Sequence, residues 1–264
     1  MCQGYHGALP EHALNLTIIT DPFFYVVAVP AVLLLGISKS GFGAGFGSLA
    51  VPMMAMAVSV PEAAAVLMPL LLAMDLLGIA AFRKDFDKAL LAFLLPFGLL
   101  GIGIGALLFK VLNAHMVAAI VGALTLLFLA QRLLFAPKAG GAPLPRWLGA
   151  VMTVASGFTS FIAHAGGPPI TAYAISLRLS PVRFTATLAF FFFVVNLSKW
   201  VPYFYLGLLD ARNLTTSLVL MPLAPIGVWI GVRMARRISQ QLFYRFLYVG
   251  MLLTGLKLLW DGLH

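Results

Sequence analysis

A glycine-rich stretch at residues 37–52 interrupts an otherwise apolar chain. Every second residue from Gly41 to Gly47 is glycine, which costs backbone entropy and helix propensity and leaves no side chain to fill space. The flanking chain is hydrophobic enough to lie in lipid. Non-helical backbone is tolerated at that depth only where protein buries it or where it lines a wet cavity. The stretch therefore predicts a broken helix that offers bare amides and hydroxyls to a polar group.

A second stretch of the same kind occupies residues 156–172. An offset of 120 residues places Gly47 on Gly167 and Ser40 on Ser160. A later apolar segment with a proline and a glycine recurs at an offset of 126 residues. Because the flanking hydrophobic segments repeat together with the breaks, the chain is predicted to contain two structural repeats.

The composition places both repeats in a membrane. Apolar residues make up 62% of the chain and charged residues 9%, and the mean hydropathy is +1.03. Apolar runs of nearly twenty residues recur, so the fold class expected is an all-α polytopic membrane protein in a lipid bilayer. The net charge of +9 fits basic cytoplasmic loops, and no nucleic-acid partner is expected.

Each half is predicted to contain a hairpin around its break followed by three transmembrane helices, giving about 8 to 10 helical segments. A linker rich in proline and glycine, residues 136–146, separates the first repeat, 1–135, from the second, 147–264. The apolar segments are residues 23–37, 48–60, 63–82, 89–109 and 117–134, then 147–162, 170–177, 184–206, 214–230 and 242–260. The N-terminal residues lack the basic region of a signal peptide, so the first segment is expected to be retained.

Basic residues predict the orientation. They cluster in the linker and in two later loops, which should therefore be cytoplasmic; these residues are Arg132, Lys138, Arg146, Arg178, Arg183, Arg233, Arg236 and Arg237. An odd number of full spans in each half gives the repeats opposite topology and places both termini outside. Inverted repeats with paired broken segments are a recurring design of secondary transporters.

Lys39 is the most informative charge near the first break. A charge within a bilayer is costly, so it has a partner or a purpose. We expect Lys39 to anchor an anion whose other oxygens bind the Ser40 hydroxyl and the amides of Gly43, Gly45 and Gly47. The alternative is that Lys39 reaches the membrane interface.

The second break contributes a further set of candidate ligands. His164 could donate to an anion or change its protonation during transport, and the alternative is a neutral histidine whose ring is bonded to a carbonyl. Ser160 is a candidate hydroxyl donor, although such residues often bond only the preceding turn. Gly166 and Gly167 would present amides to the anion.

Asp75 is the only acid inside a predicted span. Intramembrane acids commonly serve in proton relays or pair with a base, so Asp75 is a candidate for coupling, with structural pairing, for example to Lys199, as the alternative. Asn196 and Lys199 are three residues apart and share one helix face. Together with His164 they complete the coupling candidates.

The remaining patterns carry less specific expectations. Alternate glycines at Gly101, Gly103 and Gly105 suit close helix packing. The single cysteine, Cys2, excludes an internal disulfide and a paired-cysteine metal site. No nucleotide-binding loop is present, and neither a metal nor a cofactor is expected.

Both breaks resemble the repeated glycine and proline signatures of the sulfite exporter TauE/SafE family. The resemblance is carried by residues 43–47, by Val51 and Pro52, and by residues 165–169. Three positions depart from the pattern, since Phe46 and Ala165 replace glycines and Ala172 replaces a proline. The resemblance implies a carrier of sulfite, sulfonates or related anions in the inner membrane of a bacterium.

The leading functional hypothesis is therefore a secondary transporter that moves small sulfur-containing anions by alternating access, with proton coupling left open. A carrier or channel for another small organic anion, such as a carboxylate, is the alternative. An intramembrane enzyme using Ser160 or His164 with Asp75 is disfavoured, because these residues lie on separate segments without a local catalytic motif. An oligomer is neither required nor excluded by the sequence.

Overall fold

The described residues form only helices. A computed structural model describes residues 18–39, 49–82, 85–109, 111–134, 143–234 and 240–264, and over these ranges the chain forms eleven helices and no strand. The helices are α1 (Pro22–Ile37), α2 (Ala50–Met54), α3 (Val60–Phe82), α4 (Lys88–Phe109), α5 (Ala114–Leu134), α6 (Arg146–Ala163), α7 (Gly167–Ser176), α8 (Pro181–Tyr205), α9 (Ala211–Leu220), α10 (Leu223–Met234) and α11 (Gln240–Leu263). The prediction of an all-α fold is confirmed.

Several of these helices can cross a membrane. Over the described residues, three are long and apolar enough, at Val60–Ala80, Lys88–Phe109 and Ala186–Tyr205. A fourth candidate span is the pair α9 and α10, which is bent by 45°. Two further helices have shorter apolar portions, at Pro22–Ile37 in α1 and His115–Leu127 in α5. The chain is a multi-pass helical membrane protein.

The bend between α9 and α10 differs from the single span expected over residues 214–230. Pro222 lies in the turn between the two helices. Proline has no amide hydrogen to donate, and its ring clashes with the carbonyl one turn earlier, so it breaks the helix there. The second glycine-rich break is also shorter than expected, because α6 continues to Ala163 and leaves only residues 164–166 between α6 and α7.

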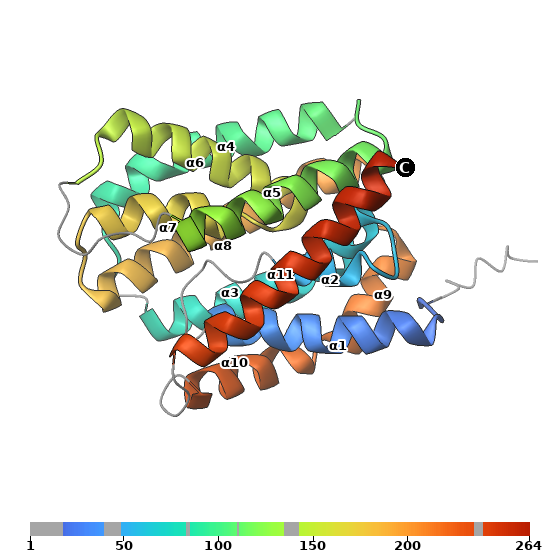
Figure 1. The fold of residues 1–264 in the computed structure, drawn as a ribbon. Helices are drawn as coiled ribbons and strands as arrows, with labels where there is room; N and C mark the ends of the chain where they lie inside the picture. The colour runs from blue at the N-terminus through green and yellow to red at the C-terminus, as the bar shows by residue number, and fades with distance from the viewer. Residues whose placement is uncertain (1–17, 40–48, 83–84, 110, 135–142, 235–239) are drawn as a thin grey trace, which may run out of the picture.

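The helices pack in pairs around a central contact between α3 and α8 (Figure 1). On one side α4 packs against α8 and against α6, and on the other α9 and α10 pack against α3 while α10 also packs against α1. Helices α5 and α11 pack along each other, with α11 crossing the face nearest the viewer in Figure 1.

Glycines allow the closest of these helix contacts. A Cβ atom on Gly101 would lie 2.1 Å from the carbonyl oxygen of Val154, and one on Gly157 would lie 2.0 Å from the carbonyl oxygen of Gly98. Helices α4 and α6 therefore touch backbone to backbone. Gly103 lies on another face of α4, where a Cβ atom would meet nothing within 4 Å.

This difference gives a matched pair of substitutions on one helix. We expect Gly101→Ala to lower the free energy of unfolding by about 1–3 kcal/mol or more, because the added carbon forces α4 away from α6. Gly103→Ala should be neutral or slightly stabilising, since alanine is the better helix former. Thermal unfolding of the purified variants in detergent measures both, and equal melting temperatures would contradict the close contact.

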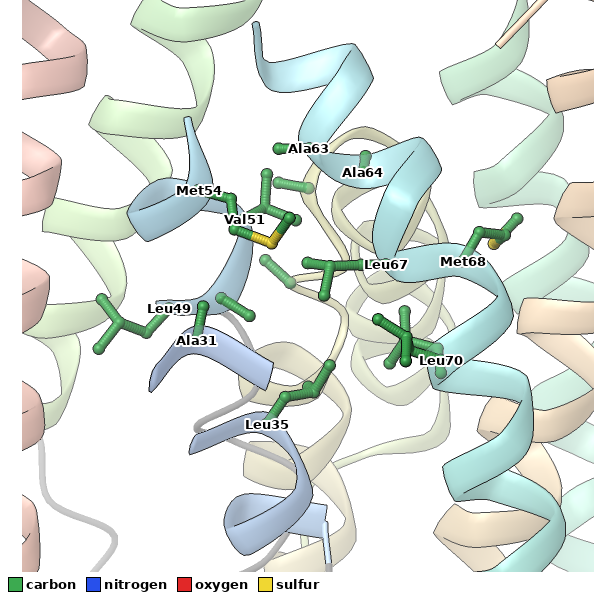
Figure 2. Packing of buried hydrophobic residues seen from close by; sticks show 14 of the residues in the cluster. Ala31, Leu35, Leu49, Val51, Met54, Ala63, Ala64, Leu67, Met68 and Leu70 are labelled. Atoms are coloured by element: carbon green, nitrogen blue, oxygen red, sulfur yellow. The ribbon is translucent and has the colours of Figure 1, made fainter. Parts of the chain in front are cut away.

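An apolar core joins the two flanks of the first break to α3. Figure 2 shows Leu35 of α1 and Val51 and Met54 of α2 directed toward the first half of α3. The labelled residues are Ala31, Leu35, Leu49, Val51, Met54, Ala63, Ala64, Leu67, Met68 and Leu70. This core fixes the residues that precede and follow positions 40–48 against the helix that carries Asp75.

Candidate functional site

Asp75 lies at the centre of a buried polar group in the interior of α3. Its side chain is 4% exposed, and its Oδ1 atom is ion-paired with Nζ of Lys39. Asn196 donates from Nδ2 to the other carboxylate oxygen, Oδ2, at 2.5 Å. Both oxygens of Asp75 are therefore engaged by side chains from two other segments. The base paired with Asp75 is Lys39 and not Lys199, the pairing suggested from the sequence.

Lys39 reaches Asp75 from the turn that follows α1. Ser38 and Lys39 continue the helix as a wider π-helical turn, a feature often found at functional sites. The Lys39 side chain is 18% exposed, so the ion pair is largely removed from solvent. Lys39 is thus held by a carboxylate within the protein, whereas the alternative expectation was that it extends to the membrane interface.

Lys199 lies on α8 and is completely buried. Its Nζ atom is 3.0 Å from the Ser160 carbonyl oxygen, 3.2 Å from Ser160 Oγ and 2.7 Å from His164 Nδ1. Among the described side chains, no carboxylate lies within ion-pair distance of this ammonium. Lys199 is therefore a buried cation whose partners are dipoles.

His164 connects Lys199 to α3. It ends α6 in the left-handed conformation, with φ 51° and ψ 26°, and its Nε2 atom lies 2.8 Å from the carbonyl oxygen of Ala64. Because an ammonium group only donates, Nδ1 must accept from Lys199, which assigns the proton to Nε2 as the donor to Ala64. The contacts match the neutral, carbonyl-bonded histidine that was the alternative expectation.

Hydroxyl groups fold the second break back onto α6. Ser156 donates to the Gly166 carbonyl oxygen at 2.6 Å. Thr159 Oγ1 lies 3.0 Å from the Ala165 carbonyl oxygen and 2.8 Å from the Ala155 carbonyl oxygen of its own helix, and its one proton can be donated to either. A Cβ atom on Gly166 would lie 2.6 Å from the Ser156 carbonyl oxygen, so no larger residue fits there without a shift.

This folding leaves hydrogen-bond donors at the break. Gly166 and Gly167 are buried, and their amides make no hydrogen bond to another described residue. The Ser160 hydroxyl accepts from Lys199, and its own proton has no described acceptor. The break thus offers donors that suit an anion.

Helix α8 connects two clusters of side chains, one around Lys39 and Asp75 and one around Lys199. Asn196, Lys199 and Tyr203 follow one another at spacings of three and four residues, which places them on one helix face. Asn196 binds Asp75, and Tyr203 donates to the Phe161 carbonyl oxygen at 2.7 Å. The Tyr203 ring also stacks near His164, with centroids 6.2 Å apart. The sequence prediction missed Tyr203, although its spacing from Lys199 was a usable signal.

We call the six side chains of these clusters the polar centre: Lys39, Asp75, Ser160, His164, Asn196 and Lys199. They come from α3, α6, α8 and the ends of two helices that flank the breaks. Four further predicted ligands, Ser40, Gly43, Gly45 and Gly47, lie outside the described residues. The predicted coupling residues therefore contact one another either directly or through α8.

Comparison with known proteins identifies the family. The family model described as Sulfite exporter TauE/SafE matches residues 28–258, which is nearly the whole chain. No curated protein and no solved structure matches the chain. Membership implies membrane transport of sulfur anions such as sulfite, and the family is one of transporters, not of enzymes. Its motifs, its all-helical membrane fold and this match together establish that the chain belongs to the sulfite exporter TauE/SafE family.

Proposed function

We propose that this protein is a secondary carrier that moves a small sulfur-containing anion, such as sulfite or an organosulfonate, by alternating access. The anion would bind at the polar centre, with further contacts from Ser40 and from the amides of Gly43, Gly45 and Gly47. The observation that carries the proposal is that two lysines lie largely removed from solvent beside a single carboxylate in the described polar centre, in a member of a sulfur-anion transport family.

With both lysines protonated, these side chains carry an excess of positive charge. Lys39 and Lys199 provide two cations, whereas Asp75 is the one carboxylate among the described residues of the polar centre. A buried charge without a counter-charge is costly, and within a membrane protein such a group marks a substrate or ion pathway. An anion bound beside Lys199 would supply the missing negative charge. The free amides of Gly166 and Gly167 would then bind its oxygens.

Reciprocal helix contacts support the proposed division into repeats 1–135 and 147–264. Gly36 of α1 touches Gly227 of α10, as Gly101 of α4 touches Gly157 of α6. Gly157 follows Gly36 by 121 residues and Gly227 follows Gly101 by 126, so each contact is the counterpart of the other. The contacts of α3 with α8 and of α5 with α11 would then join equivalent helices of the two halves.

The polar centre lies where these halves meet. Lys39 binds Asp75 within the first half, and Lys199 binds Ser160 within the second. At the polar centre two hydrogen bonds cross between the halves, one from Asn196 to Asp75 and one from His164 to the Ala64 carbonyl. Transporters with inverted repeats place their substrate at such an interface and rock one repeat against the other.

The charges at the two ends of the bundle support the proposed orientation. Hydrogen bonds from Leu144 to Ser176 and from Asp87 to Thr187 mark one end, and the described basic residues near it are Lys88, Arg146, Arg178, Arg183 and Arg233. The Glu62–Arg212 and His115–Asp261 contacts mark the other end, which carries the acids Asp21, Glu62, Asp210 and Asp261 and the basic residues Arg212 and Lys257. The first end also carries the acids Asp85 and Asp87, so basic residues outnumber acids there and acids outnumber basic residues at the other end. By the positive-inside rule the first end would be cytoplasmic and both termini would be outside.

Cysteine labelling in intact cells tests this orientation. In a Cys2→Ser background, an impermeant maleimide should label Asp261→Cys, because that position is expected outside, and should leave Lys88→Cys unlabelled until the membrane is permeabilised. The reverse pattern would place the termini in the cytoplasm and contradict the proposal.

The substrate class is tested by charge movement on a solid-supported membrane. Liposomes with the purified protein should give saturable currents on addition of sulfite, sulfate, thiosulfate, taurine or sulfoacetate, with acetate as the carboxylate comparison. A response to at least one sulfur compound above that to acetate is expected. A response to the carboxylate alone would keep a carrier and overturn the sulfur substrate.

A further inference from the structure

The carboxylate of Asp75 is already paired with Lys39, the cation that is proposed to bind the substrate. Lys39 Nζ is paired with Oδ1, and Asn196 Nδ2 is 2.5 Å from Oδ2. With Asp75 4% exposed and Lys39 18% exposed, water competes little for this pair. An anion that enters the site must therefore either leave this pair intact or take the place of Asp75.

The charges around Asp75 determine whether the anion leaves the pair intact or replaces Asp75. Besides Lys39, the basic side chain of the polar centre on the packed helices is Lys199 of α8. His164 at the end of α6 donates from Nε2 to the Ala64 carbonyl oxygen, and its Nδ1 faces Lys199. Most other described titratable groups on helices against α3 have partners elsewhere. Arg212 pairs with Glu62, His115 contacts the Asp261 carbonyl, Arg233 stacks on Trp229, Arg146 stacks on Phe93, and Tyr203 donates to the Phe161 carbonyl. Arg183 is exposed in the first turn of α8.

A charge count then distinguishes substrates by valence. With both lysines protonated and the carboxylate ionised, the centre has one net positive charge, which a monovalent anion neutralises. A divalent anion would leave the centre with one net negative charge. Buried charge without compensation is strongly disfavoured, so a divalent anion requires one more positive charge, and the acid that can take it up as a proton is Asp75.

We propose that Asp75 is an internal counter-anion which a divalent substrate displaces from Lys39, so that each dianion binds together with one proton taken up at Asp75. The Lys39 ammonium then donates to an oxygen of the anion. The neutral carboxyl group still accepts from Asn196 through one oxygen, and its new O–H donates to the anion. This inference rests on the proposed function only in that the polar centre is the transport site, and it does not depend on a sulfur substrate.

Proton uptake on anion binding tests the proposal directly. Purified full-length protein in a weakly buffered detergent solution with a pH indicator would be mixed with sulfate, thiosulfate or fumarate, which all remain divalent from about pH 6 to 8. We expect about one proton taken up for each dianion bound. By linkage, the apparent dissociation constant should then fall about tenfold for each unit of decrease in pH while Asp75 is ionised in the free protein.

Two variants assign the proton to its residue. Asp75→Asn should bind the same dianion without proton uptake and with an affinity independent of pH, because the amide releases Lys39 permanently. Glu62→Gln is the matched control: it is also an acid-to-amide change on α3, but Glu62 pairs with Arg212 at the far end of that helix. It should keep both the proton uptake and the pH dependence. The wild-type proton count decides the question even if Asp75→Asn fails to fold.

Each outcome has one meaning. Binding of a sulfur dianion by the wild type without proton uptake would overturn the role of Asp75 and leave the proposed function standing. Binding of fumarate alone, with one proton, would exclude sulfate and thiosulfate as ligands and support the role of Asp75. Failure of every dianion to bind would overturn the role of Asp75 and leave the proposed function to monovalent sulfur anions.

Discussion

Replacing Lys39 with methionine should abolish anion-induced currents and lower the free energy of unfolding by about 3–5 kcal/mol, as expected when one member of a buried ion pair is removed. The variant leaves Asp75, which is 4% exposed, with Asn196 as its described partner. It also removes the cation proposed to bind the anion. Charge movement on a solid-supported membrane and unfolding in detergent measure the two effects separately.

A second substitution separates these effects further. The double variant Lys39→Met/Asp75→Asn should recover most of the stability, because no uncompensated carboxylate remains, but it should still carry no current. Lys257→Met is the control, since Lys257 and Asp261 form an exposed pair, with the two side chains 42% and 39% exposed. Its loss should cost less than about 0.5 kcal/mol. Wild-type affinity and rate in Lys39→Met would contradict the anchor.

Lys199→Met should also abolish transport, with a smaller effect on stability. Ser160 and His164 would lose the ammonium that now lies within hydrogen-bond distance of three of their atoms. The Ser160 carbonyl keeps its bond from the His164 amide, so the acceptor left unpaired is His164 Nδ1, at about 1–3 kcal/mol. Part of that loss is offset, because methionine does not carry the free-energy cost of removing an ammonium group from water. We therefore expect a folded protein that no longer holds the excess positive charge an anion would neutralise.

Ser198→Ala is the control on the same helix. The Ser198 hydroxyl donates to the Val195 carbonyl oxygen in its own helix, so its removal should leave transport and melting temperature close to wild type. The readout that matters is anion affinity in a variant shown to be folded. Saturable currents of normal affinity in Lys199→Met would exclude Lys199 from the site.

Much of this fold could be predicted from the sequence because a membrane restricts the choices. Long apolar runs between polar loops have few other structures available, so the helical class and most helix positions followed from hydropathy. The bend at Pro222 was missed because the apolar run continues across it. Hydropathy reports where the chain lies and does not report whether its axis is straight.

The site was predictable as a set of residues but not as a set of contacts. Asp75, Lys199 and His164 stood out because polar groups are rare within apolar segments. The pairing of Asp75 with Lys39 joins residues 36 apart, and its bond to Asn196 joins residues 121 apart. Such contacts depend on how α3 and α8 pack. The Ala64 carbonyl that accepts from His164 has no sequence signal, because every residue has a carbonyl.

Counterflow measures the central claim, alternating access by a carrier, most directly. Proteoliposomes loaded with unlabelled sulfite, or with whichever anion gives the largest current, would be diluted into a trace of the same labelled anion. A carrier predicts that label accumulates transiently above its equilibrium level, because the binding site returns occupied, and that Lys39→Met shows no such overshoot. Label entry at the same rate into loaded and empty vesicles, together with a steady anion conductance, would contradict alternating access and identify a channel.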